Sequence, residues 1–244
     1  MKVLVTGAAG VMGGHVINAC KKGLGGSDSE PVLYDIAGGE GIYSSLSDIK
    51  EKADIVVDFS NHLGTKAILD YCVENNMPAV IATTGHTPEE KAEIKAASEK
   101  IPVFYSGNFS LGIAALVSLT KQAAKLFPDA DIEIVEAHHT RKIDAPSGTA
   151  LMIAEGIKEV RPESTFNVGR SGQGKRTKEE IGIHSLRMGN VVGMHEVIIN
   201  TGTQALTLKH EAFDRALFAE GGLAAGEFLL AKAPGLYDMA DLTA

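Results

Sequence analysis

The sequence predicts an α/β protein, in which a doubly wound parallel sheet is followed by a second, α+β domain built on a mixed sheet. Over roughly the first hundred residues, short apolar runs alternate with helical patterns. The runs are apolar throughout, as in strands that are buried on both faces. After Gly107 the regular alternation ends, and from Ile183 to Leu208 the chain is expected to form several strands without intervening helices, which is typical of an α+β domain.

The elements of the first part follow one another in regular order. Lys2–Thr6 is a β-branched run that ends at a glycine, and a helical pattern around Val11–Lys22 comes next. The same criteria then predict strand Pro31–Ile36, strand Ala53–Phe59, helix Thr65–Glu74, strand Pro78–Thr83, helix Pro88–Lys100 and strand Pro102–Tyr105.

The second part begins with a long apolar helix. The elements predicted are helix Leu111–Phe127, strand Asp131–His138, helix Ala150–Val160, a glycine- and charge-rich loop Gly169–Gly182, several strands from Ile183 to Leu208, and helix Phe213–Ala231. We expect Lys175, Arg176 and Lys178 in the loop to be solvated. We therefore predict a dinucleotide-binding domain of residues 1–106 and 214–244, and a substrate-binding and oligomerisation domain of residues 107–213.

Composition narrows the class of protein. The chain has 244 residues, 44% hydrophobic and 22% charged, which is ordinary for a globular protein. Its net charge of −8 argues against binding to nucleic acid. Cys20 and Cys72 lack metal-ligand spacing, so we expect reduced, structural thiols and no metal site. The start Met1–Gly7 does not resemble a signal peptide and no apolar run could span a membrane, so we expect a cytoplasmic protein.

A glycine-rich turn follows the first predicted strand. It reads Gly7-Ala8-Ala9-Gly10-Val11-Met12-Gly13, and Asp35 comes about twenty residues later, at the end of the second strand. Such glycines let backbone N–H groups approach a pyrophosphate, and such an aspartate accepts hydrogen bonds from ribose hydroxyls. The order of strand, glycines, helix, strand and acid predicts a Rossmann-type cofactor site. Its residues would be Gly7, Gly10, Val11, Met12, Gly13 and Asp35.

The most informative segment is EAHHTRKIDAPSGTA, residues 136–150. It brings two histidines, an arginine and a lysine together just before a helix that opens at Ser-Gly-Thr. The amino end of a helix favours an anion, and histidine can donate a proton near neutral pH. The segment therefore fits a small, multiply anionic substrate that must be protonated. A solvated basic surface is the alternative that composition alone leaves open.

This segment resembles the signature of the dihydrodipicolinate reductases (4-hydroxy-tetrahydrodipicolinate reductases) of bacterial lysine and diaminopimelate biosynthesis. The similarity covers essentially the whole chain, including IHSLRMGNVVG at 183–193 and the C-terminal FAEGGLAAGEFLLAKAPGLYDMADL. The resemblance implies an NAD(P)H-dependent oxidoreductase. It would transfer a hydride to an unsaturated cyclic imine with two carboxylates, giving tetrahydrodipicolinate.

The resemblance also implies roles for individual residues. His138 would be the proton donor, and Lys142 would assist it or hold a carboxylate as a point charge. We expect Glu136 to orient or neutralise the basic cluster. Further substrate contacts are expected from His139, Ser147, Gly148 and Thr149.

Three more segments resemble parts of the family that line the ribose and nicotinamide. Two are the strand-end turns Asp58-Phe59-Ser60 and Thr83-Thr84-Gly85, with Ala82 where the family usually has glycine. In the third, 106–112, Asn108 and Ser110 can also cap the helix that follows. The further cofactor-binding residues expected are Phe59, Ser60, Thr83, Thr84, Gly85, Asn108 and Phe109.

The second strand also bears on the choice of cofactor. A 2′-phosphate usually requires arginine or lysine there, but Asp35 is followed by Ile36-Ala37-Gly38-Gly39. We therefore expect a preference for NADH. Several members of the family accept both cofactors, so NADPH is expected as a weaker second cofactor.

Two other functions compete with this interpretation. Another nicotinamide-dependent dehydrogenase of a small dicarboxylate or amino acid would share the glycine turn, but would have no reason to carry HHTRKIDAPSGT. A redox-sensing regulator would need a DNA-binding module or a basic face, and this acidic chain shows neither. By analogy with the family we expect a homotetramer, assembled through the sheet of the second domain.

Overall fold

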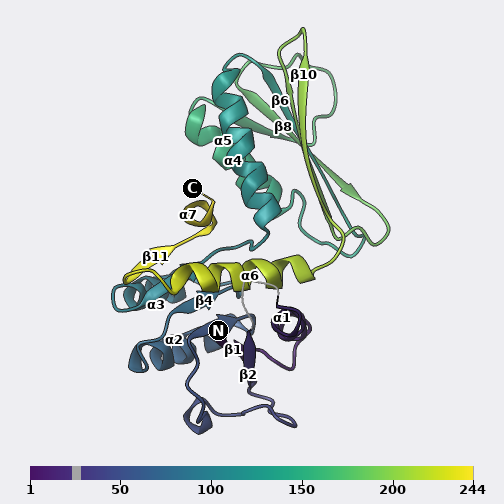
Figure 1. The fold of residues 1–244 in the computed structure, drawn as a ribbon. Helices are drawn as coiled ribbons and strands as arrows, with labels where there is room; N and C mark the ends of the chain where they lie inside the picture. The colour runs from purple at the N-terminus through teal and green to yellow at the C-terminus, as the bar shows by residue number, and fades with distance from the viewer. Residues whose placement is uncertain (24–28, 244) are drawn as a thin grey trace. The chain divides into compact units, whose positions relative to one another are not determined.

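The structure is a computed structural model that describes residues 1–23 and 29–243 (Figure 1). The chain divides into two compact units. Unit 1 comprises Met1–Ser110 and Arg215–Leu242, and unit 2 comprises Leu111–Asp214. Unit 1 contains a six-stranded parallel sheet with helices, and unit 2 a five-stranded mixed sheet, so the predicted fold class is confirmed.

In unit 1 the strands lie in the order β11-β5-β4-β3-β1-β2, and every pairing is parallel. The strands are β1 (Lys2–Thr6), β2 (Glu30–Tyr34), β3 (Ile55–Asp58), β4 (Ala79–Ile81), β5 (Pro102–Tyr105) and β11 (Gly235–Tyr237). The helices are α1 (Val11–Lys21), α2 (Thr65–Glu74), α3 (Pro88–Ser98), α6 (Ala216–Leu229) and the short α7 (Met239–Leu242).

Helices cover both faces of this sheet, which is why its strands are apolar throughout. Ile55 and Val57 of β3 pack under Gly222 and Gly226 of α6, and α1 lies beside α6. The side chains that point to the opposite face of the sheet, such as Val56, pack in the core formed with α2 and α3. Because β1, β3 and β4 are parallel neighbours, their carboxyl ends meet at one edge of the sheet. Ligands of doubly wound folds bind at this edge.

In unit 2 the strand order is β10-β9-β6-β8-β7, with β6 parallel to β8 and antiparallel to β9. The strands are β6 (Asp131–His138), β7 (Thr165–Val168), β8 (Glu180–Arg187), β9 (Gly193–Asn200) and β10 (Ala205–Ala212). The helices α4 (Leu111–Leu126) and α5 (Gly148–Val160) pack against each other and on the sheet, where they enclose a core of isoleucine, leucine, valine and alanine.

The structure corrects the sequence prediction at several places. Strands β7 and β11 were not predicted, and β8 begins at Glu180, inside the predicted loop 169–182. Arg176 of that loop was expected to be solvated, but its guanidinium binds Asp131 and Glu133 and the carbonyl oxygen of Ile132. The guanidinium also donates to the carbonyl oxygen of Glu180, the first residue of β8, and so ties the start of this strand to β6.

Two other expectations concern the whole chain. Cys20 and Cys72 are free and buried, and burial raises the pKa of both thiols, to about 11 for Cys20. Of the helices described, none combines the length and hydropathy that crossing a bilayer requires.

Candidate active site

The glycine turn of unit 1 has a conformation that only glycine adopts easily. Gly7, directly after β1, has φ of +73°, and a Cβ atom there would lie 2.8 Å from Cα of Ser60. Gly10 precedes α1 and offers no side-chain cap, so the N–H groups of the first helical turn keep no side-chain acceptor. A close-packed glycine turn leading to an uncapped helix start is suited to a phosphate group.

Asp35 lies directly after β2, because that strand ends at Tyr34 and not at 36 as predicted. Its two carboxylate oxygens accept from the N–H groups of Ala9, at 3.1 Å, and Ala37, at 2.9 Å. The carboxylate is therefore tied to the glycine turn, and among the described residues no cation pairs with it.

Asp58 joins the strand ends at this edge of the sheet. It is fully buried, and Oδ1 accepts from the hydroxyls of Thr6 and Ser60, both at 2.5 Å. Oδ2 accepts from the hydroxyl of Thr83 at 2.9 Å. Because these partners follow or end different strands, one carboxylate fixes the turns after β1, β3 and β4 relative to one another.

The other expected cofactor residues of unit 1 differ in exposure. Thr84 and Gly85 are exposed, whereas Phe109 is buried against Phe59, with ring centroids 6.1 Å apart. Oδ1 of Asn108 accepts from the backbone N–H of Ser110 just before α4. Asp58 thus brings Thr6, Ser60 and Thr83 together, with Gly7 packed against Ser60. Phe109 has a place in the core.

Three side chains of unit 2 form a cluster at the end of β6, in which Glu136 and His138 are buried and Arg187 is half-buried. Nδ1 of His138 is 2.6 Å from Oε2 of Glu136, which is fully buried. Arg187, on the neighbouring β8, donates to Oε2 and Oε1 of Glu136 at 2.9 and 2.8 Å. Burial alone would raise the pKa of Glu136, but the hydrogen bonds it accepts, first of all from Arg187, lower it to about 2. Burial lowers the pKa of His138, against the opposing effect of ionised Glu136.

Helix α5 begins beside this cluster. Ser147 is its N-cap: Oγ accepts from the N–H of Ala150, and the Ser147 N–H donates to Oε1 of Glu136. The same hydroxyl is 3.1 Å from Nε2 of His195, whose ring lies 5.2 Å from that of His138. Ser147, expected to contact substrate, is thus buried and engaged within the protein, while Gly148 at the start of α5 is exposed.

The remaining basic residues lie on the loop after β6. Nζ of Lys142 is 2.9 Å from Oδ1 of Asp144, and Arg141 donates to the side-chain carbonyl of Asn190. His139 is half-buried, and its Nδ1 is buried without a hydrogen-bond partner among the described residues. Lys142 and His139 are thus half-buried, whereas Arg141 is exposed.

The sequence did not indicate Arg187 or His195 as parts of this cluster. Arg187 reaches it because β6 and β8 pair with His138 opposite Arg187, and His195 because β6 and β9 pair with Glu136 opposite His195. Both residues fall within or next to the segment 183–193. Only the order of strands in the sheet, which spacing along the chain does not give, connects them to Glu136.

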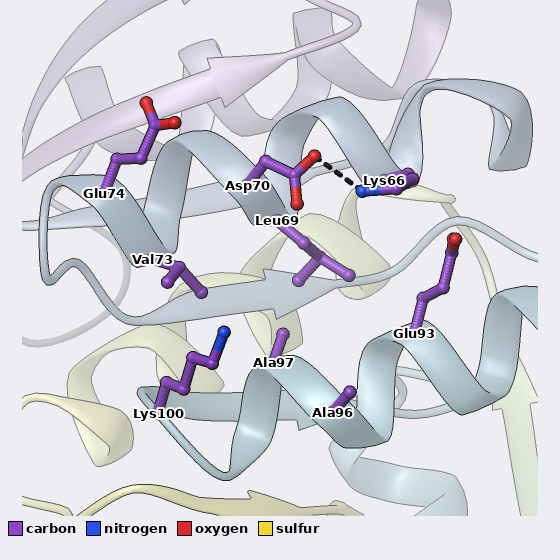
Figure 2. Close-up of a pocket in the computed structure, with 9 residues that line it drawn as sticks. All are labelled: Lys66, Leu69, Asp70, Val73, Glu74, Glu93, Ala96, Ala97 and Lys100. Atoms are coloured by element: carbon purple, nitrogen blue, oxygen red, sulfur yellow. Dashed lines mark hydrogen bonds and ion pairs between the residues drawn. The ribbon is translucent and has the colours of Figure 1, made fainter.

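A groove elsewhere in unit 1 contains none of these residues. It lies between α2 and α3 (Figure 2) and carries the ion pair of Lys66 and Asp70. Its lining mixes both charges with small apolar side chains. Across residues 1–23 and 29–243, no group of His, Cys, Asp or Glu could hold a metal ion.

The doubly wound sheet with its glycine turn, and the second unit with its histidine–carboxylate pair, are features of a dinucleotide-dependent oxidoreductase. Residues 1–109 match the family described as dihydrodipicolinate reductase, N-terminus, and residues 112–243 match dihydrodipicolinate reductase, C-terminus. The chain therefore belongs to the dihydrodipicolinate reductase family, whose members are NAD(P)H-dependent oxidoreductases. The resemblance stated from the sequence is confirmed.

Individual members of the family are similar in sequence to this chain over nearly its full length. The chain is 42% identical to a 4-hydroxy-tetrahydrodipicolinate reductase of Caldanaerobacter subterraneus subsp. tengcongensis, covering 99% of this chain and 98% of the relative. The enzyme of the same name from Clostridium tetani is 40% identical, with 98% and 95% covered. A dipicolinate-bound dihydrodipicolinate reductase from Paenisporosarcina sp. TG-14 has the same fold, with a TM-score of 0.79 at 24% identity over 98% and 97% of the two chains.

Proposed function

We propose that this chain reduces the cyclic imine dicarboxylate derived from 4-hydroxy-tetrahydrodipicolinate to tetrahydrodipicolinate, with a nicotinamide cofactor, in lysine and diaminopimelate biosynthesis. The observation that carries the proposal is the buried pair of Glu136 and His138 beside Lys142 and the start of α5, in a chain of this family. Relatives about 40% identical over their full length bear the name of this activity.

The residues of unit 1 fit a dinucleotide. The turn Gly7–Gly13 has no room for side chains at Gly7 or Gly13, and the helix that follows has no acid in its first turn. We assign the pyrophosphate to this turn and the adenosine ribose to Asp35. The strand-end turns held by Asp58 would line the nicotinamide half, through Ser60, Thr83, Thr84 and Gly85. When bound, the nicotinamide supplies the hydride.

The residues of unit 2 fit a dicarboxylate substrate. Lys142 and His139 offer a cation and an imidazole. The exposed residue Gly148 begins α5, where the helix dipole favours an anion. We assign one carboxylate to Lys142 and His139, and the other to Gly148 and Thr149. The Paenisporosarcina enzyme binds dipicolinate, a planar dicarboxylate, which supports a dicarboxylate as the substrate of this chain.

His138 is assigned the proton transfer. Addition of the hydride leaves the substrate as an electron-rich enamine, which must take up one proton to give the product. An imidazolium can donate that proton near neutral pH, and the neutral ring then regains a proton from water. Lys142 would help by stabilising the substrate carboxylate throughout.

We further propose that NADH is the preferred cofactor. A 2′-phosphate next to Asp35 would place two anions together, and among the described residues the carboxylate has only backbone N–H partners. Lys2 pairs with Glu30 at the opposite end of β1 and β2 and does not offset the charge.

We assign residues 1–106 and 214–244 to cofactor binding, and 107–213 to substrate binding and self-association in a cytoplasmic homotetramer. On the face of the unit 2 sheet away from α4 and α5, apolar side chains are half-buried or exposed, namely Val135, Leu186, Met194 and Ile198. A second copy of the sheet could cover them. Light scattering after gel filtration tests this part, and a monomeric mass would contradict it.

The function is tested by following NADH oxidation with the condensation product of pyruvate and aspartate semialdehyde. We expect oxidation that depends on this product and is inhibited by pyridine-2,6-dicarboxylate. Absence of substrate-dependent oxidation with both NADH and NADPH would contradict the proposal.

A further inference from the structure

One nitrogen of the His138 ring is committed to the protein. Glu136 is ionised over the whole working pH range, because its pKa is lowered to about 2, and a carboxylate can only accept hydrogen bonds. Since Nδ1 lies 2.6 Å from Oε2 of Glu136, Nδ1 carries a proton whether the ring is neutral or charged. The proton that the ring gains and loses therefore resides on Nε2.

The surroundings of Nε2 agree with that role. Among the described residues Nε2 makes no hydrogen bond. Gly193, at the start of β9, lies next to it, and a Cβ atom there would be only 3.2 Å from Nε2. The lack of a side chain at Gly193 thus leaves room beside the nitrogen that exchanges its proton.

Arg187 fixes the carboxylate that holds the ring. Its two terminal nitrogens bind the two oxygens of Glu136, a bidentate geometry that lysine cannot reproduce. The guanidinium is itself held, because it also donates to the carbonyl oxygens of Leu186 and Asp144. With the N–H of Ser147 on Oε1, the Glu136 carboxylate has no freedom to turn away from His138.

The charges facing His138 come from each neighbouring element. They are Glu136 on β6, Arg187 on β8 and Lys142 on the loop after β6, while the His195 ring on β9 lies against it. His195 is neutral near pH 7, because burial lowers its pKa to about 4. Glu136 favours the charged His138 ring, and the cations Arg187 and Lys142 oppose it. Removing Glu136 or Arg187 should therefore shift the His138 titration in opposite directions.

We propose that Arg187 is a positioning residue which, through Glu136, holds the His138 ring so that Nε2 is the atom that gives the proton. The inference rests on the proposed function, because it refines the role assigned to His138. Arg187 touches neither substrate nor cofactor in this account.

The first test is the tautomer of His138, read from its ring nitrogens by NMR of the ¹⁵N-labelled protein without substrate. We expect the neutral ring to carry its proton on Nδ1 in the parent, and a mixture of tautomers in Glu136→Gln. A parent protein whose neutral His138 carries its proton on Nε2 would overturn the proposal. Because this readout needs no turnover, a protein with the expected tautomer but no reductase activity would contradict the proposed function alone.

The second test compares Arg187→Gln with the matched control Arg161→Gln. Arg161 lies at the opposite end of α5 and donates to the carbonyl oxygen of Ala130. In Arg187→Gln we expect the pKa of His138 to rise, because a cation that lowers it is removed. We also expect kcat to fall roughly 10- to 100-fold, as for lost outer partners of other functional imidazoles. Arg161→Gln should keep the parent's titration and kcat. Glu136→Gln should shift the titration downward.

If Arg187→Gln does not fold, the more conservative variant Arg187→Lys allows the same two measurements, the His138 titration and kcat. Arg187→Lys retains the charge but loses the bidentate contact, so its His138 titration should stay near the parent's while kcat remains lowered. NADH affinity should be unchanged in all these variants. An Arg187 variant that is folded and matches the parent in both titration and kcat would overturn the proposal.

Discussion

The hydroxyl of Thr83 donates to Oδ2 of Asp58 at 2.9 Å, and this contact joins the end of β4 to the end of β3. Oδ1 of the same carboxylate accepts from the hydroxyls of Thr6, at the end of β1, and Ser60. A single buried side chain therefore fixes three of the segments that we assign to the cofactor.

Replacing Asp58 by asparagine should disturb this arrangement, because an amide NH₂ cannot accept the hydroxyl protons that a carboxylate oxygen accepts. We expect the free energy of unfolding to fall by about 1–3 kcal/mol and NADH to bind more weakly. Urea unfolding and fluorescence titration with NADH measure the two effects. The matched control is Asp54→Asn, because Asp54 is exposed at the other end of β3 and its carboxylate accepts from the backbone N–H of Lys2. Equal behaviour of the two variants would contradict the role of Asp58.

Replacing His138 by glutamine should lower kcat by about 10²–10⁴-fold, which is the usual contribution of general acid catalysis. NADH binding should be nearly unchanged, because His138 belongs to unit 2 and we assign the cofactor to unit 1. His139→Gln is the comparison variant and should mainly raise KM. If His138→Gln changed only KM, His138 would be a substrate-binding residue and not the proton donor.

Lys142 is the cation assigned to a substrate carboxylate. We expect Lys142→Ala to weaken the binding of pyridine-2,6-dicarboxylate by roughly 10-fold or more at low salt, with a smaller loss at high salt because exposed charges are screened. Asp144→Asn should have the opposite effect, since Asp144 lies 2.9 Å from the Lys142 ammonium and competes for it. Unchanged inhibitor affinity of Lys142→Ala at low salt would rule out this contact.

Buried His195 should make the protein less stable in mild acid. Burial lowers its pKa from 6.5 to about 4, so above pH 6.5 the residue is neutral in both folded and unfolded chains. As the pH falls from 6.5 to 4, only the unfolded chain takes up the proton, and the folded state loses up to about 3 kcal/mol. Below pH 4 this contribution levels off.

His195→Gln should therefore flatten the decline of the unfolding free energy between pH 6.5 and 4.5, measured by urea titration at several pH values. Glu136 also stabilises the folded state, because its pKa is lowered from 4.5 to about 2. This stabilisation is lost only as the pH falls below 4.5, so it does not affect the comparison between pH 6.5 and 4.5. A variant with the parent's slope would show that His195 does not cause the decline.

Among residues 1–23 and 29–243 no cation pairs with Asp35, and this predicts which cofactor the protein prefers. The parent should have the higher kcat/KM with NADH, and Asp35→Asn should narrow the difference because it removes the negative charge near the 2′-position. Both cofactors must be compared at one ionic strength. A parent enzyme that favours NADPH tenfold, or about 1.4 kcal/mol, would contradict the prediction.

The sequence predicted elements well where local pattern decides the structure. Strand 131–138 and helix 65–74 have the predicted bounds, because their periodicity and flanking residues agree with their place in the fold. Strand β11 was missed because its three residues form a strand only by pairing with β5, which is distant in the chain. Arg176 was misplaced for a similar reason, since its acidic partners lie on β6.

In the candidate site, too, local features could be predicted from the sequence, whereas contacts between distant segments could not. Histidine and lysine in the segment 136–150, and the glycines of the turn 7–13, could be recognised because their chemistry and spacing are local. The roles of Asp58 and Arg187 could not, because they depend on which strands are neighbours. Ser147 could be recognised as important, but its hydroxyl caps α5 and contacts His195.

The central claim is that this chain transfers a hydride from the nicotinamide to the ring and a proton from His138. The most direct measurement is the mass of the product formed from the condensation product of pyruvate and aspartate semialdehyde with NADH deuterated at the transferred position of C4. We predict tetrahydrodipicolinate that carries one deuterium, formed rapidly by the parent and at least about 100-fold more slowly by His138→Gln. Product without deuterium, or equal rates for parent and variant, would contradict the account.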